Sequence, residues 1–124
     1  MSVEQDLIRT SVNFSKFHRD KIRGTLLSFT KKVIKETPVD TGRLRGNWQA
    51  SLNVPELGVL QSKDRGGNNA ISDANSAVSA LKLGDIFWFT NNLPYARRME
   101  EGGSNQAPQG MLRTNVALLV SKFR

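Results

Sequence analysis

Apolar side chains recur at helical intervals through the first third of the chain. Residues 3–36 contain no proline and a single glycine, so no strong breaker interrupts a helix there. We predict one long helix within residues 1–36, or two collinear ones, ended by Pro38, because proline disfavours helical geometry in the residue before it. The apolar residues that fit one face of this helix are Ile8, Val12, Ile22, Leu26, Phe29 and Val33.

The period changes to two after Gly46. Apolar and polar residues alternate over 48–54, which predicts a strand with one buried face that Pro55 ends. Residues 57–60 are predicted to form a short return strand. Residues 85–90, DIFWFT, are almost continuously apolar, which is typical of a central strand buried on both faces.

Residues 61–73 contain a Gly-Gly-Asn-Asn sequence and little apolar surface, which predicts a mobile loop. Lys63 and Arg65 lie near its start, where they are candidates to reach a neighbouring subunit. Deletion of residues 66–70 is expected to spare folding.

Three further helical segments are predicted. Ala74, Val78 and Leu81 share the face of a short helix, residues 95–101 fit a helical turn, and the segment from Pro108 onward has the apolar spacing of a carboxy-terminal helix. The predicted fold class is α+β. The long amino-terminal helix and the carboxy-terminal helix are expected to pack on one face of a small antiparallel sheet.

Length and composition exclude several classes of protein. The 124 residues fit a single domain, 1–124. The chain has no cysteine and one histidine, His18, which excludes disulfides, thiolate metal sites and histidine clusters. We therefore expect that the chain is not an enzyme, has no catalytic residue and binds no metal or cofactor. No apolar run approaches the roughly 18 residues of a membrane span, so we expect no membrane partner and synthesis in the cytoplasm.

The net charge of +7 is concentrated in the first part of the chain, where residues 1–45 hold ten Lys/Arg against five Asp/Glu. Such a surplus favours contact with phosphates or acidic proteins without specifying either. A basic nucleic-acid-binding module that contacts DNA is therefore the alternative function.

The first polar cluster is ETPVDTGRLRGNW, residues 36–48. Asp40 as a general base would need a second group beside it, and no such group is visible in the sequence. A structural interpretation uses the same residues in a turn, in which Asp40 and Thr41 bond backbone amides and Gly42 takes a positive φ. Arg43 and Arg45 would then project outward, where a guanidinium can meet a neighbour's carboxylate.

The second cluster is TNNLPYARRMEEGGSNQAPQGMLR, residues 90–113. Adjacent carboxylates such as Glu100 and Glu101 seldom face the same metal ion on a helix, and a solvated surface of mixed charge is the simplest interpretation. A more specific hypothesis is that the Arg97–Arg98 pair of one subunit meets the acidic pair of the next in a head-to-tail ring.

Taken together and in this order, TPVDTGRLRGNW and LGDIFWFTNNLPYARRMEEGGSNQAPQGMLR resemble the tail-completion proteins of long-tailed bacteriophages, also called neck or tail-terminator proteins. The resemblance covers roughly residues 36–120. The positions that match the first motif are Pro38, Asp40, Thr41, Gly42, Leu44 and Arg45. Those that match the second are Asn92, Pro94, Tyr95, Ala96, Glu100, Gly102, Ala107, Pro108 and Met111.

The resemblance implies a small α+β structural protein without enzymatic activity. Such proteins form a ring, commonly a hexamer, that completes the head-proximal end of the tail tube and joins it to the head. The implied partners are other copies of the chain, the tail tube protein and a head-connector or adaptor protein, with the exiting DNA as a passive contact. The implied location is the tail or neck of the virion. The candidate residues for contacts with other subunits or the tail are Asp40, Thr41, Arg43, Arg45, Lys63, Arg65, Tyr95, Arg97, Arg98, Glu100 and Glu101.

Overall fold

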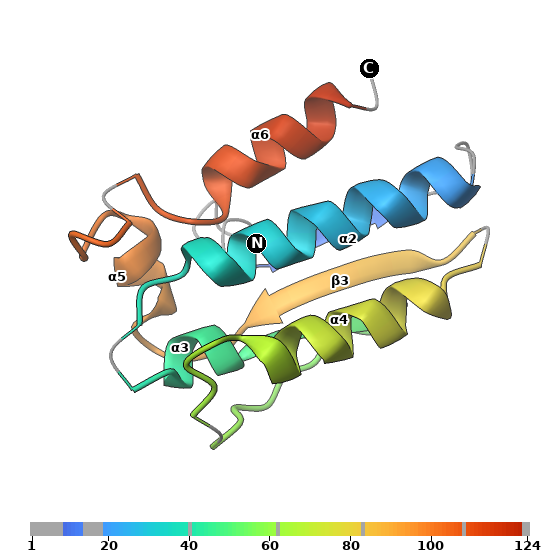
Figure 1. The fold of residues 1–124 in the computed structure, drawn as a ribbon. Helices are drawn as coiled ribbons and strands as arrows, with labels where there is room; N and C mark the ends of the chain where they lie inside the picture. The colour runs from blue at the N-terminus through green and yellow to red at the C-terminus, as the bar shows by residue number, and fades with distance from the viewer. Residues whose placement is uncertain are drawn as a thin grey trace.

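Helices on one face of a three-stranded antiparallel sheet make up this molecule (Figure 1). The computed structural model describes residues 9–13, 19–39, 41–61, 63–82, 84–107 and 109–122. The α+β class predicted from the sequence is confirmed. Among the described residues, no helix is long and apolar enough to cross a membrane. The elements in chain order are β1 (Arg9–Asn13), α2 (Arg19–Glu36), α3 (Arg43–Gly46), β2 (Trp48–Leu52), α4 (Asn68–Ser79), β3 (Ile86–Asn91), α5 (Ala96–Glu100) and α6 (Arg113–Ser121).

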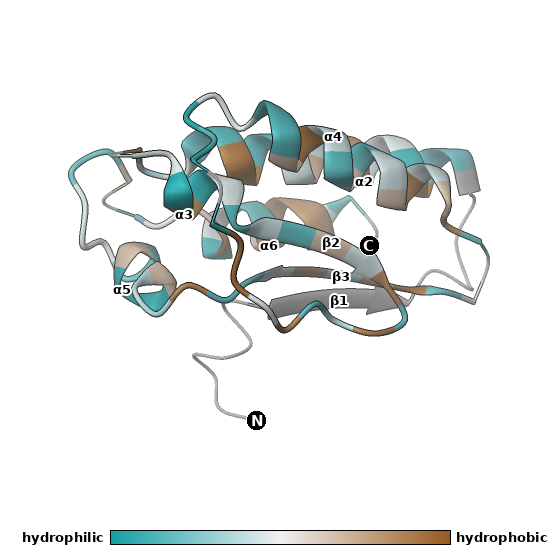
Figure 2. Ribbon diagram, turned by 90° about the horizontal axis from the view of Figure 1, so that it is seen from below, coloured by the Kyte–Doolittle hydropathy of each residue, from teal (hydrophilic) through white to brown (hydrophobic). Residues whose placement is uncertain are grey.

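The sheet has the order β1-β3-β2, and both pairs are antiparallel. The aromatic strand β3 is therefore central, as predicted. Figure 2 shows α2, α4 and α6 on the same side of the sheet. The two short helices α3 and α5 lie together at the end of the sheet where β3 ends (Figure 1).

The core forms where the stripe of α2 meets the aromatic residues of the sheet. Phe89 stacks on Trp48 with ring centroids 4.7 Å apart and meets Phe29 edge-on at 5.9 Å. Aromatic pairs in these geometries stabilise a core beyond the area they bury. The predicted stripe residues of α2 are all buried, namely Ile22, Leu26, Phe29 and Val33.

The predicted long helix is wrong in its first half. Residues Arg9–Asn13 form β1, which pairs with β3 so that Val12 lies opposite Phe87. The segment Thr10-Ser11-Val12-Asn13 consists of weak helix formers. The helix prediction for it depended on two apolar residues, Ile8 and Val12, and the hydrogen bonds to β3 favour a strand instead. Ile8 lies outside the described residues.

The predicted return strand at 57–60 is also wrong, and β2 ends at Leu52 instead of Val54. Asn53 adopts a positive φ of 69°. Its backbone N–H donates to the Ile86 carbonyl at 2.7 Å, and its side-chain oxygen accepts the Ile86 N–H at 3.0 Å. Asparagine tolerates this left-handed conformation better than most residues, so the chain turns away here before Pro55 is reached.

The predicted loop at 61–73 is wrong over its second half, because α4 begins at Asn68. Asp64 is buried and its Oδ2 accepts the N–H of Ala70 at 3.0 Å, which satisfies one of the free amides of the first helical turn. Gly67, at φ 76°, precedes the helix with its Cα against Ile34. Ala70, Ala74 and Val78 of α4 are buried, so this segment is part of the core.

The expectation that deletion of residues 66–70 spares folding is therefore reversed, because the deletion removes Gly67 and the first turn of α4 and should prevent cooperative folding. A milder test is Asp64→Ala, which leaves the buried Ala70 N–H unsatisfied and should lower the free energy of unfolding by about 1–3 kcal/mol. Urea denaturation measures this loss. Asp73→Ala, at an exposed position of the same helix, is the control and should change stability by less than about 0.5 kcal/mol. Equal effects of the two substitutions would contradict the capping role.

Candidate functional site

The first polar cluster connects the end of α2 to β2. Thr37 donates its hydroxyl to the Val33 carbonyl at 2.7 Å and accepts the indole N–H of Trp48 at 2.8 Å. Both Thr37 and Trp48 are buried. This pair ties the last turn of α2 to the first residue of β2 and fixes the two ends of the intervening turn.

Gly42 brings this turn into contact with the segment that leads to α4. Its φ is 92°, and a Cβ at this position would lie 2.4 Å from the backbone nitrogen of Arg65. The Gly42 carbonyl accepts two N–H groups, from Gly46 at 2.9 Å and from Asp64 at 3.0 Å. The predicted positive φ of Gly42 is confirmed, and both its backbone conformation and its close packing require glycine.

Arg45 folds back into the protein and does not project outward as predicted. Its Nη1 donates to the Arg65 carbonyl at 2.7 Å, and its Nη2 donates to the carbonyls of Lys35 and Thr37, both at 2.9 Å. Two of these carbonyls belong to the end of α2, where a cation also meets the negative end of the helix dipole. Burial lowers the pKa of the Arg45 guanidinium, and the charge of Asp64 offsets part of this shift. Arg45 is therefore a structural clamp.

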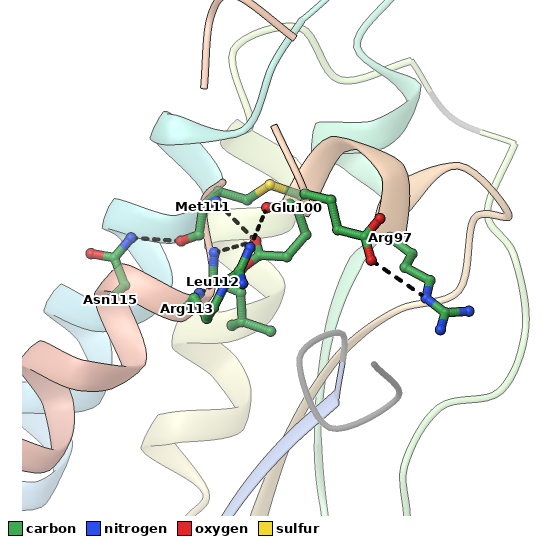
Figure 3. A network of polar contacts seen from close by, with 7 residues as sticks. Arg97, Glu100, Met111, Leu112, Arg113 and Asn115 are labelled. Atoms are coloured by element: carbon green, nitrogen blue, oxygen red, sulfur yellow. Dashed lines mark hydrogen bonds and ion pairs between the residues drawn. The ribbon is translucent and has the colours of Figure 1, made fainter. Parts of the chain in front are cut away.

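Glu100 is likewise structural, and the prediction that it lies at a subunit surface is wrong. Its carboxylate is buried at the start of α6 (Figure 3). The Oε1 accepts the backbone N–H groups of Met111 and Leu112 at 2.9 and 2.8 Å, and the Oε2 accepts that of Arg113 at 2.8 Å. A carboxylate at this position satisfies the free amides of a helix and complements its dipole.

The neighbouring charges of the second cluster lie at the surface. Glu101 pairs with Arg97 at 3.9 Å, and both side chains are about half exposed. Arg98 is exposed. The two adjacent acids thus have different roles, one inside and one outside. Within the described ranges, no group of three or more His, Cys, Asp or Glu residues is arranged to hold a metal ion.

The two polar clusters meet around one groove, which we call the motif groove, with a volume of about 610 Å³. Its apolar lining comes from both clusters and consists of Pro38, Val39, Leu44, Tyr95 and Met99. Gln106 joins the two clusters at the backbone, since its side-chain oxygen accepts the Val39 N–H at 2.8 Å and its side-chain nitrogen donates to the Val39 carbonyl at 2.9 Å.

The polar lining of the motif groove includes Thr41, Arg43 and Lys63. The Nε of Arg43 is buried and has no hydrogen-bond partner in the described part of the chain. Lys63 is exposed and forms no ion pair with the described residues. The groove therefore combines an apolar surface with positive charge that the described residues leave unneutralised.

The structure thus separates the predicted interface residues into groups. Thr41, Arg43, Lys63 and Tyr95 lie at the motif groove. Arg65 and the Arg97–Arg98 pair are exposed outside its lining, and Asp40 lies outside the described residues. Sequence reasoning missed the contributions of Val39, Met99 and Gln106 to the groove. No local pattern marks these residues, because the contact between Val39 and Gln106 spans 67 positions.

Comparisons with protein-family models, with curated proteins and with solved structures found no match to this chain.

Substitution of the two adjacent acids distinguishes their roles. Glu100→Gln replaces one acceptor oxygen by an NH₂ group at the amides of α6, and should lower the free energy of unfolding by about 1.5–3 kcal/mol. Glu101→Gln removes only an exposed ion pair and should cost less than about 1 kcal/mol. Chemical denaturation of both variants measures the difference. A Glu101→Gln variant as unstable as Glu100→Gln would refute this assignment.

Proposed function

We propose that this chain is a structural virion protein that forms a homo-oligomeric ring, hexameric by its resemblance, at the head-proximal end of a phage tail. The observation that carries the proposal is the meeting of the two clusters. Residues 36–48 and 90–113, whose sequences resemble tail-completion proteins, line the same groove despite their separation along the chain.

The groove has the chemistry of a protein-binding surface. Tyr95 is partly exposed on its apolar side, next to Met99, and Arg43 lies on its polar side. Tyrosine, arginine and methionine are enriched at protein interfaces, and tyrosine and arginine are frequent among the residues that dominate binding energy. The partners proposed are other copies of the chain, the tail tube protein and a head-connector or adaptor protein.

Complementation of a phage that lacks this protein tests the proposal. We expect the null phage to accumulate unjoined heads and tails in electron micrographs, and the parent protein to restore infectious particles that contain it. Tyr95→Ala and Arg43→Ala should complement poorly, because loss of a central interface residue typically costs about 2 kcal/mol or more of binding free energy.

Lys82→Ala, at an exposed position outside the groove, is the matched control and should complement like the parent. Circular dichroism verifies that all three variants fold. Mass spectrometry of purified particles tests whether the protein is part of the virion. Its absence from intact virions would contradict the proposal.

DNA binding is a second candidate function, favoured by a row of lysines on α2. Lys21, Lys31, Lys32 and Lys35 are exposed and lie within about 100° of one another around the helix axis. We call this row the lysine stripe. Part of its charge is engaged, because Lys32 pairs with Glu36 at 3.8 Å and Lys35 donates to the Gly66 carbonyl at 2.9 Å. Lys21 and Lys31 have no such partner among the described residues.

Binding to duplex DNA at several salt concentrations tests this second function. If the lysine stripe contacts phosphates, the affinity should fall steeply with salt, with a slope of about 0.9 per neutralised phosphate on logarithmic axes. The double variant Lys21→Ala/Lys31→Ala should reduce that slope by about 2, whereas Lys82→Ala serves as the control for charge elsewhere. Absence of binding at low salt would exclude the function.

A further inference from the structure

Residues 54–60 cross the face of the sheet that is turned away from the helices. The register places Gln49 opposite Thr90, on the face opposite to Phe89. Thr90 donates its hydroxyl to the Glu56 carbonyl at 3.3 Å, and Gln49 donates its side-chain amide to the Gly58 carbonyl at 2.8 Å. We call residues 54–60 the tethered strip.

Two asparagines complete the tether. Asn92 donates to the carbonyls of Glu56 and Gly58 at 2.8 and 3.0 Å. Asn47 donates to the Leu60 carbonyl at 2.9 Å and accepts the N–H of Leu60 at 2.7 Å. The carbonyls of residues 56, 58 and 60 therefore face inward, as alternate residues of an extended chain do, and the strip is held in one conformation by side chains.

The side chains of the tethered strip are apolar and exposed. Val54 and Leu57 are 69% and 67% exposed, and Val59 and Leu60 are each 38% exposed. Four exposed apolar side chains thus lie within seven residues, and exposed apolar surface marks interaction sites where it is contiguous. Glu56 lies among them, is exposed, and has no ion-pair partner within the described ranges.

The tethered strip and the motif groove are complementary in chemistry. The strip presents apolar side chains with one carboxylate, and the groove presents an apolar lining with Arg43 and Lys63. Arg43 forms no ion pair with the described residues, and a carboxylate is the acceptor that matches a guanidinium best. The groove volume of about 610 Å³ lies within the range of about 300–1,000 Å³ that is typical of ligand-binding clefts.

We propose that the motif groove of one copy of this chain receives the tethered strip of a second copy, with Glu56 at Arg43 and Lys63 and exposed apolar side chains of the strip against the apolar lining. The two surfaces differ, so the contact is head to tail and its repetition produces a ring or a filament. The inference rests on the proposed function and deepens it by naming the two surfaces that join neighbouring subunits. Because the strip is already held in place, little conformational entropy is lost when it binds.

A charge exchange tests the contact. Glu56→Arg places a cation opposite Arg43 and Lys63, and Lys63→Glu places an acid opposite Glu56. Each variant alone should reduce the association constant, measured by sedimentation of concentrated protein, by about threefold to tenfold or more. An equimolar mixture of the two should recover association, because the unaltered strip of one variant meets the unaltered groove of the other, and the introduced arginine meets the introduced glutamate at the alternate contacts. Lys82→Glu is the control for net charge, and circular dichroism verifies folding.

Disulfide trapping tests the same contact inside assembled tails. The natural chain has no cysteine, so Glu56→Cys and Lys63→Cys each introduce a unique thiol. Tails assembled from a mixture of these two variants should yield the mixed disulfide dimer in clear excess over tails assembled from Glu56→Cys and Lys82→Cys.

The outcomes separate this inference from the proposed function. If the protein is present in tails but the two cysteine mixtures cross-link equally, or if folded charge variants associate like the parent, the strip-to-groove contact is overturned and the proposed function stands. If the charge exchange restores association but purified virions lack the protein, the contact is supported and the virion function fails.

Discussion

The close approach of two backbone segments at Gly42 is the constraint on which the arrangement of this end of the molecule depends. A single carbonyl there accepts the N–H of Gly46, within the turn of α3, and the N–H of Asp64, on the segment before α4. Any side chain at position 42 would separate the two segments. Their contact places Asp64 where it caps α4 and places the Arg65 carbonyl within reach of Arg45. The end of α2, α3 and the start of α4 are thereby locked together.

Other irregular segments are held in place by hydrogen bonds from side chains to the backbone. Gln106 pairs with both backbone groups of Val39, Asn91 donates to the buried carbonyl of Leu44 at 2.9 Å, and Glu100 gathers the amides that begin α6. Buried backbone groups outside helices and strands need such partners. The consequence is that the connecting segments around the motif groove have their backbone groups paired with side chains of the same chain.

The sequence predicts the periodic parts of this fold well and the parts that depend on distant contacts poorly. The α2 stripe and the central position of β3 follow from local spacing. The first strand was predicted as helix because Arg9–Asn13 gains its conformation from β3, more than 70 positions later in the chain. The start of α4 was missed because its cap, Asp64, lies in a segment whose glycines and asparagines are typical of a loop.

The candidate site, like the fold, could be predicted from the sequence only in part. The folded chain brings residues of clusters 36–48 and 90–113 together around the motif groove, and Arg43 and Tyr95 are among its lining residues. The sequence does not distinguish Arg43 from Arg45, or Glu100 from Glu101, since each pair has the same chemistry at nearly the same position. The difference arises from which carbonyls or amides lie within reach, and those belong to segments that meet only in the folded chain.

The strand order has a consequence for how the protein folds during synthesis. Both edge strands, β1 and β2, precede the central strand β3 in the chain and pair only with it. Neither strand pair of the sheet can form until β3 has left the ribosome. Until then α2 also lacks Phe87 and Phe89 of β3, on which its apolar face packs. Contacts so distant in sequence slow folding and leave apolar surface transiently open to aggregation. The apolar stripe of α2 therefore stays without the strand it packs on until residues 86–91 have been synthesised.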